Sequence, residues 1–83
     1  MKDAAGVALT ALAWVLSDTA RADRFLALTG LTPDGLRASV AQGSTHRAVL
    51  EFLCAHEPDL LAAADALGMA PAQLAALRDE VAL

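Results

Sequence analysis

Glycine and proline residues recur at matching positions in the two halves of this chain. Because they mark the ends and starts of helices, they restrict its fold more than any other feature. Gly30 precedes Pro33 by three residues, and Gly68 precedes Pro71 by three residues, so the second pair repeats the first at an offset of 38 residues. Glycine is favoured directly after a helix, and proline is favoured in the first helical turn. Each pair therefore predicts a corner between two consecutive helices.

The residues between these corners favour helices rather than strands. Alanine and leucine, which have high helix propensities, number 21 and 15, whereas there are five valines and no isoleucine or tyrosine. Capping residues then divide the chain into six helices, which we expect from Asp3 to Ser17, from Asp18 or Thr19 to Gly30, from Thr32 to before Gly43, from Ser44 or Thr45 onward, from Pro58 to Gly68, and from Pro71 onward. The prediction is an all-α protein, a compact bundle of about six short helices.

The 38-residue offset also predicts an internal duplication. We expect one domain over residues 1–83, built from similar three-helix halves at about 4–42 and 44–81, because each half is too small to bury its apolar face alone. Trp14 and Phe52 correspond at this offset, and we place both near the centre. The predicted core residues are Leu12, Trp14, Phe25, Leu36, Leu50, Phe52 and Leu74.

These residues also carry a resemblance to a known family. The stretch Phe25-Leu26-Ala27-Leu28-Thr29-Gly30-Leu31-Thr32-Pro33, followed by Leu36-Arg37, resembles a signature of domain of unknown function 3572, a group of small bacterial proteins. Val49-Leu50-Glu51-Phe52-Leu53, then Leu60-Leu61 and the turn from Gly68 to Pro71, is similar to its second signature. The resemblance implies a small soluble helical protein and supplies no catalytic residues. Ala63 departs from the family, which tends to carry a bulky aromatic residue there, and this predicts looser packing in the second half.

The distribution of charge along the chain indicates which class of molecule it binds. The net charge is −4, and the residues before Gly43 carry four basic and four acidic side chains, so the acidic excess lies in the second half. A nucleic-acid-binding protein usually has a basic surface, which this chain lacks. Arg21, Arg24 and Arg37 form the only basic grouping, and they are candidates for contact with an acidic partner. We expect a protein partner or a homo-oligomer, with no nucleic acid and no membrane.

The first helix and the single cysteine indicate in which cellular compartment the protein resides. The apolar run of residues 4–16 is shorter than the roughly 20 residues that span a bilayer. A signal peptide ending near Ala20-Arg21-Ala22 is an alternative, but Asp3 interrupts its basic start. Cys54 has no second cysteine to pair with, which suits a reducing compartment. We therefore predict a cytoplasmic protein.

Two patterns suggest a specific chemistry, and both have a simpler interpretation. The corners at Gly30 and Gly68 fit a helix-turn-helix template. Asp34 would face phosphate at the first corner, and Asp79 lies beside Arg78 at the second, so without a basic surface we favour an ordinary helical corner. Metal-ligating residue types gather at His46, Cys54, His56, Glu57 and Asp59. Their spacing does not place four ligands on one face, so Cys54 is interpreted as a core residue and His56 as a helix-end residue. No metal or cofactor is expected.

The chain contains no phosphate-binding glycine loop, nucleophile elbow or convincing carboxylate pair, so we expect no enzymatic activity. The first helix, however, is apolar on nearly every side, more than one amphipathic helix needs. The leading hypothesis is a non-enzymatic helical module that binds another protein or itself. The alternative is a degenerate helix-turn-helix DNA-binding regulator.

Overall fold

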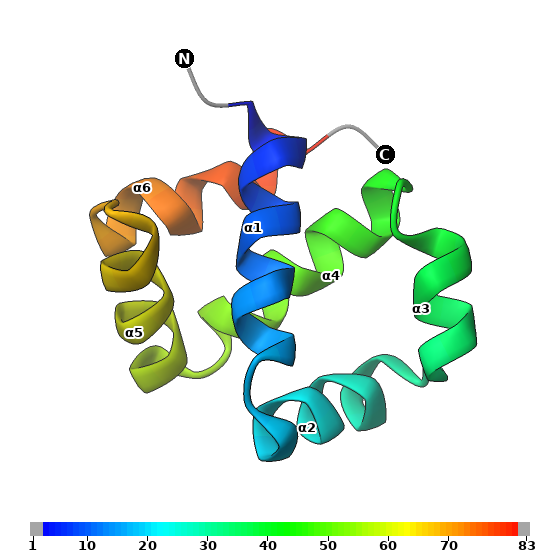
Figure 1. The fold of residues 1–83 in the computed structure, drawn as a ribbon. Helices are drawn as coiled ribbons and strands as arrows, with labels where there is room; N and C mark the ends of the chain where they lie inside the picture. The colour runs from blue at the N-terminus through cyan, green and yellow to red at the C-terminus, as the bar shows by residue number, and fades with distance from the viewer. Residues whose placement is uncertain (1–2, 82–83) are drawn as a thin grey trace.

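The computed structural model describes residues 3–81, and in this part of the chain all regular secondary structure is helical, which confirms the predicted all-α class (Figure 1). The last helix continues into a short 3₁₀ turn, η1 (Leu77–Asp79). The six α-helices are α1 (Ala4–Leu16), α2 (Thr19–Thr29), α3 (Pro33–Ser39), α4 (Gly43–Cys54), α5 (Glu57–Leu67) and α6 (Pro71–Ala76).

Side-chain caps explain where the first three helices begin. The side chains of Asp3, Asp18 and Thr32 accept hydrogen bonds from backbone N–H groups in the first turns of α1, α2 and α3, respectively. These bonds satisfy donors that have no partner inside the helix. At the opposite ends, Gly30 and Gly68 close α2 and α5 with φ of 74° and 69°, the left-handed conformation that glycine adopts without steric cost.

The boundaries of α3, α4 and α5 differ from the sequence expectation. α3 ends at Ser39, and α4 begins at Gly43 after Gln42, so neither Ser44 nor Thr45 caps it. Thr45 is buried instead, and its Oγ1 donates a hydrogen bond to Ser39 Oγ across the α3–α4 connection (3.0 Å). α5 begins at Glu57, which places Pro58 second in the helix.

Helix α1 lies in the middle of the molecule and packs against α2, α4 and α5. α5 and α6 lie on one side of α1, and α3 lies on the other side (Figure 1). α6 and η1 also pack against α4, whereas α3 stands at the outer edge. The internal duplication therefore stays a prediction, because α3 and α6 occupy the same place in the repeat but differ in their packing.

The core contains six of the seven residues predicted for it, and Trp14 is the exception. Leu12, Phe25, Leu36, Leu50, Phe52 and Leu74 are each at most 6% exposed. Trp14 is only partly buried at the edge of the core, with the guanidinium of Arg21 over its ring. Placing Trp14 near the centre was therefore wrong. Phe25 and Phe52 instead pack on each other inside the core.

Ala63 is fully buried, so solvent does not reach its side chain. It lines neither of the two hollows described below. In the described part of the chain no single helix is both long and apolar enough to cross a membrane. Only α5 joined to α6 and η1 reaches that length and composition, and this pair is bent by 103°.

Candidate functional site

An apolar groove of about 390 Å³ lies between α1 and α3, with α2 closing one end. We call it the α1–α3 groove. Arg37 is the one charged residue in its wall, and the other lining residues are apolar: Leu12, Leu16, Leu26, Pro33, Leu36 and Val40. Binding sites in proteins have volumes of this order and are lined mostly by apolar side chains with a few polar groups.

Polar contacts hold both ends of α3 beside the groove. At its start, Thr32 caps the helix directly after the left-handed turn at Gly30. At its end, His46 of α4 donates a ring N–H to the carbonyl oxygen of Val40 (2.8 Å), beside the Thr45–Ser39 bond. His46 is 5% exposed. These contacts hold the end of α3, and Leu36 packs the inner side of the helix into the core at 6% exposure.

The exposed side of α1 continues the apolar surface of the groove. Leu9 and Leu16 are 39% and 43% exposed, and they are seven residues apart, which places them on the same side of the helix. No charged residue occurs in α1 between Ala4 and Leu16. We call Leu9 and Leu16 the α1 ridge. The sequence predicts excess apolar surface on this helix, but it contains no local signal for the groove.

Arg37 is held only loosely at the rim of the groove. Its Nη1 lies 2.8 Å from Asp34 Oδ1, one helical turn away, and the two side chains are 77% and 91% exposed. Exposed pairs of this kind contribute about 0–1 kcal/mol to stability because water screens them. The pair neutralises the charge at the rim, and Arg37 can exchange Asp34 for another acceptor at little cost.

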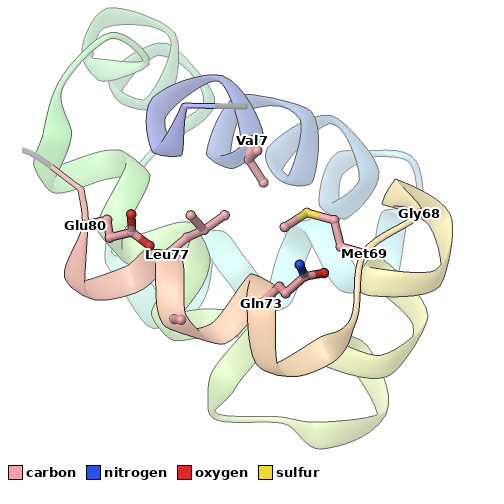
Figure 2. Close-up of a pocket in the computed structure, with 7 residues that line it drawn as sticks. Val7, Gly68, Met69, Gln73, Leu77 and Glu80 are labelled. Atoms are coloured by element: carbon pink, nitrogen blue, oxygen red, sulfur yellow. The ribbon is translucent and has the colours of Figure 1, made fainter. Parts of the chain in front are cut away.

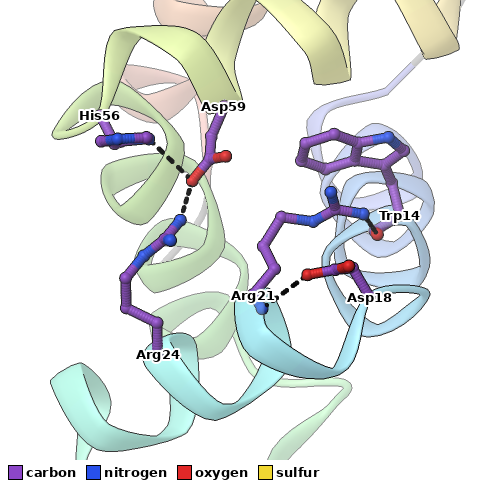
Figure 3. Close-up of polar contacts among 6 residues, drawn as sticks. All are labelled: Trp14, Asp18, Arg21, Arg24, His56 and Asp59. Atoms are coloured by element: carbon purple, nitrogen blue, oxygen red, sulfur yellow. Dashed lines mark hydrogen bonds and ion pairs between the residues drawn. The ribbon is translucent and has the colours of Figure 1, made fainter.

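The other two arginines predicted to contact a partner are engaged within the molecule (Figure 3). The guanidinium of Arg21 lies 3.5 Å from the centre of the Trp14 ring and donates to Trp14 O. Arg24 forms an ion pair with Asp59 of α5 and lies 5.1 Å from the centre of the Phe52 ring. The three arginines therefore do not form one patch, since only Arg37 lines the groove.

The candidate metal-ligating residues are also dispersed. His46 is buried against Val40, whereas His56 Nδ1 lies 3.0 Å from Asp59 Oδ2 (Figure 3). His56 ends the α4–α5 connection and occupies the N-cap position of α5. Cys54 is partly exposed, so interpreting it as a core residue was wrong. Among residues 3–81, no three His, Cys, Asp or Glu side chains lie together as a metal site would require.

A second hollow of about 490 Å³ lies between the first half of α1 and the α5–α6 corner (Figure 2). Val7, Met69 and Leu77 supply apolar surface, and Gln73 and Glu80 supply polar groups. The Gln73 Oε1 atom already accepts a hydrogen bond from the N–H of Ala70 (3.0 Å). Glu80 is the one titratable residue in the lining, so the hollow holds no pair of groups for acid–base chemistry.

The α5–α6 corner has the angle of a helix-turn-helix unit. The axes of α5 and of α6 with η1 differ by 103°, and the typical range is about 90–120°. The residues that follow on this second helix, however, include Asp79 and Glu80 beside Arg78. The angle fits the motif, and the charges do not favour contact with phosphate.

Comparison with known proteins identifies a family. No functionally curated protein and no solved structure matches the chain. The family described as protein of unknown function (DUF3572) matches residues 1–82. The match covers the α1–α3 groove, both helical corners and the second hollow. The resemblance found in the two sequence signatures is thereby confirmed, and the chain belongs to the DUF3572 family.

Proposed function

We propose that this protein is a non-enzymatic, cytoplasmic interaction module that binds a helical segment of a protein chain in the α1–α3 groove. The observation that carries the proposal is the composition of the groove, in which six of the seven lining residues are apolar. Amphipathic helices bind in grooves of this kind by inserting apolar side chains at helical spacing. The α1 ridge extends the same apolar surface beyond the groove.

The distribution of titratable groups also supports a binding role. Arg37 is the one titratable residue that lines the groove, and Glu80 is the one that lines the second hollow. Many acid–base and nucleophilic enzymes use two such groups within hydrogen-bonding reach of each other or of the bound substrate. Neither hollow brings two such groups together, whereas an apolar wall with one charge at its rim suits the binding of a peptide.

Affinity purification from the native host tests the proposal when a groove variant is compared with a matched surface variant. Leu16→Asp places a carboxylate in the groove, and Leu61→Asp places one on α5, where the leucine has a similar exposure of 47%. We expect the wild type and Leu61→Asp to retain the same protein and Leu16→Asp to lose it. Equal retention by all three variants would exclude the groove as the binding surface.

The second candidate function, DNA binding through a helix-turn-helix corner, is supported by the 103° angle between α5 and α6 with η1. The same purification distinguishes it. Nucleic acid that is retained at low salt and released at moderate salt would support a DNA-binding regulator, because phosphate contacts weaken steeply with ionic strength. A protein held by apolar contacts would stay bound at the higher salt concentration.

A further inference from the structure

We propose that the helix bound in the α1–α3 groove carries a carboxylate beside its apolar stripe, and that Arg37 recognises this carboxylate. This inference rests on the proposed function and deepens it, since it names the chemical class of the bound segment, an acidic amphipathic helix. Three properties of Arg37 support it: its place in the groove, its weak internal partner and its unused donors.

Arg37 lies within the apolar side that α3 contributes to the groove. Four of the lining residues belong to α3 and its C-cap, at positions 33, 36, 37 and 40, and this spacing places them along one side of the helix. The neighbours of Arg37 on this side are Pro33, Leu36 and Val40, which are apolar. A helix that lies across these residues therefore covers Arg37 as well.

Covering a guanidinium restricts the chemistry of the segment that covers it. The group cannot be deprotonated in proteins, and a charge removed from water without a hydrogen-bonding partner costs free energy. A segment with only apolar side chains over Arg37 incurs this cost, whereas a carboxylate offsets it by accepting two parallel N–H bonds. A lysine or arginine at the same place would add like-charge repulsion. The groove therefore favours an acidic helix over a neutral or a basic one.

Asp34 occupies only part of the guanidinium. Asp34 does not line the groove, and its Oδ1 atom accepts one hydrogen bond from Arg37 Nη1 (2.8 Å). A guanidinium has five N–H donors, and within residues 3–81 Arg37 has no other hydrogen bond or ion pair. Because both side chains are largely exposed, water screens the attraction between them. Arg37 therefore has donors for a bound carboxylate, and Asp34 is a weak competitor.

The charge around the groove also allows an acidic segment to approach. The excess of four negative charges lies after Gly43, whereas the residues before it carry four basic and four acidic side chains. The groove is built from α1, α2 and α3, which belong to this balanced part, and α1 contains no charged residue. Among the described residues that line the groove, the positive charge of Arg37 thus has no acidic neighbour.

Selection from a displayed library of helical peptides tests the inference. The peptides present leucines at helical spacing with randomised flanking residues, and they are selected on the folded full chain. Binders that Leu16→Asp abolishes are those that use the groove. We expect these binders to be rich in Asp and Glu on the wild type and in Lys and Arg on Arg37→Glu. The control Arg47→Glu changes the net charge equally, in a partly exposed pair on α4 outside the groove, and should select the same acidic peptides as the wild type.

Binding measurements with one selected peptide give the size of the effect. Replacing its glutamate with glutamine should raise the dissociation constant on the wild type about tenfold, since a charge-assisted pair is lost. Arg37→Gln should remove this difference. Asp34→Asn removes the competing carboxylate and should lower the dissociation constant of the acidic peptide by about twofold to threefold. Circular dichroism checks that each variant is folded, and if Arg37→Glu is not, loss of the acidic preference on Arg37→Gln is the result that counts.

Three results would overturn the inference, and they differ in what they mean for the proposed function. Groove binders with the same flanking charges on the wild type and on Arg37→Glu would exclude recognition by Arg37 but leave the groove as a helix-binding site. A reversal of preference on Arg47→Glu as well would assign it to the net charge, again without affecting the groove. A complete lack of binders that depend on Leu16 would contradict the groove itself, and with it both proposals.

Discussion

Phe25 of α2 and Phe52 of α4 meet edge to face in the core, with ring centroids 5.3 Å apart and ring planes at 90°. Phe25 is fully buried, and Phe52 is 6% exposed. This arrangement places the positive edge of one ring against the negative face of the other. The guanidinium of Arg24 also lies over the Phe52 ring at 5.1 Å, so the pair connects the core to the Arg24–Asp59 ion pair between α2 and α5.

Replacing Phe25 with alanine should therefore destabilise the protein strongly. We expect Phe25→Ala to lower the free energy of unfolding by about 3–5 kcal/mol, since it leaves a cavity and removes the aromatic contact. Leu28→Ala, on the exposed side of the same helix, should change it by less than about 0.5 kcal/mol. Urea denaturation followed by circular dichroism measures both values. Similar losses in the two variants would contradict the central role of the Phe25–Phe52 pair.

A larger side chain at Ala63 should not fit. Ala63 is fully buried and lines neither hollow, so we expect Ala63→Phe to cost about 1–3 kcal/mol through overpacking. The neighbouring Ala62 is exposed, and Ala62→Phe provides the control. Thermal unfolding of the two variants gives the comparison. A gain in stability from Ala63→Phe would instead reveal the loose packing expected from the family resemblance.

Replacing either corner glycine should destabilise the protein, because the backbone at both positions is left-handed. A Cβ atom added at Gly30 or Gly68 would meet nothing within 4 Å, so the cost of a substitution there comes from the backbone conformation alone. We expect Gly30→Ala and Gly68→Ala each to lower the free energy of unfolding by about 1–2 kcal/mol. Asparagine tolerates this conformation better, so Gly30→Asn should lose less than Gly30→Ala in the same denaturation experiment. Equal losses from the two substitutions would contradict this origin of the cost.

His46 should hold the end of α3 and thereby the width of the groove. His46→Ala leaves the carbonyl of Val40 without its donor, and we expect a loss of about 1–3 kcal/mol. Hydrogen exchange of the α3 amides should quicken at the same time. Arg47→Ala is the control, because the Arg47–Glu51 pair is partly exposed and 3.7 Å apart and should contribute less than about 0.5 kcal/mol. Unchanged exchange in α3 after His46→Ala would argue against this anchoring role.

Local rules predicted most of the secondary structure from the sequence. Asp18 caps the start of α2, and Gly30, Thr32 and Pro33 define the α2–α3 corner. Each acts on backbone a few residues away, so these roles can be recognised without the tertiary structure. The start of α4 could not be recognised in the same way, because Thr45 forms its hydrogen bond with Ser39 across a connection rather than within its own helix.

The groove and the position of Trp14 depend on packing between helices. The apolar character of α1 predicted that part of its apolar surface stays exposed, but not which residues remain exposed. The buried contact of His46 with Val40 ties the end of α3 to α4, and the sequence pattern gives His46 no partner. Likewise, Arg21 stacks on Trp14 across the α1–α2 turn, which leaves the indole at the edge of the core.

Site-specific photo-crosslinking in the native host tests the central claim most directly. A photoreactive amino acid replaces Leu16 in the groove or, as a control, Leu61 on α5, which lies on the opposite side of α1 from α3. We expect a discrete protein adduct from position 16 that position 61 does not give. No protein adduct from position 16, or the same adduct from both positions, would contradict the claim that the α1–α3 groove binds a protein chain.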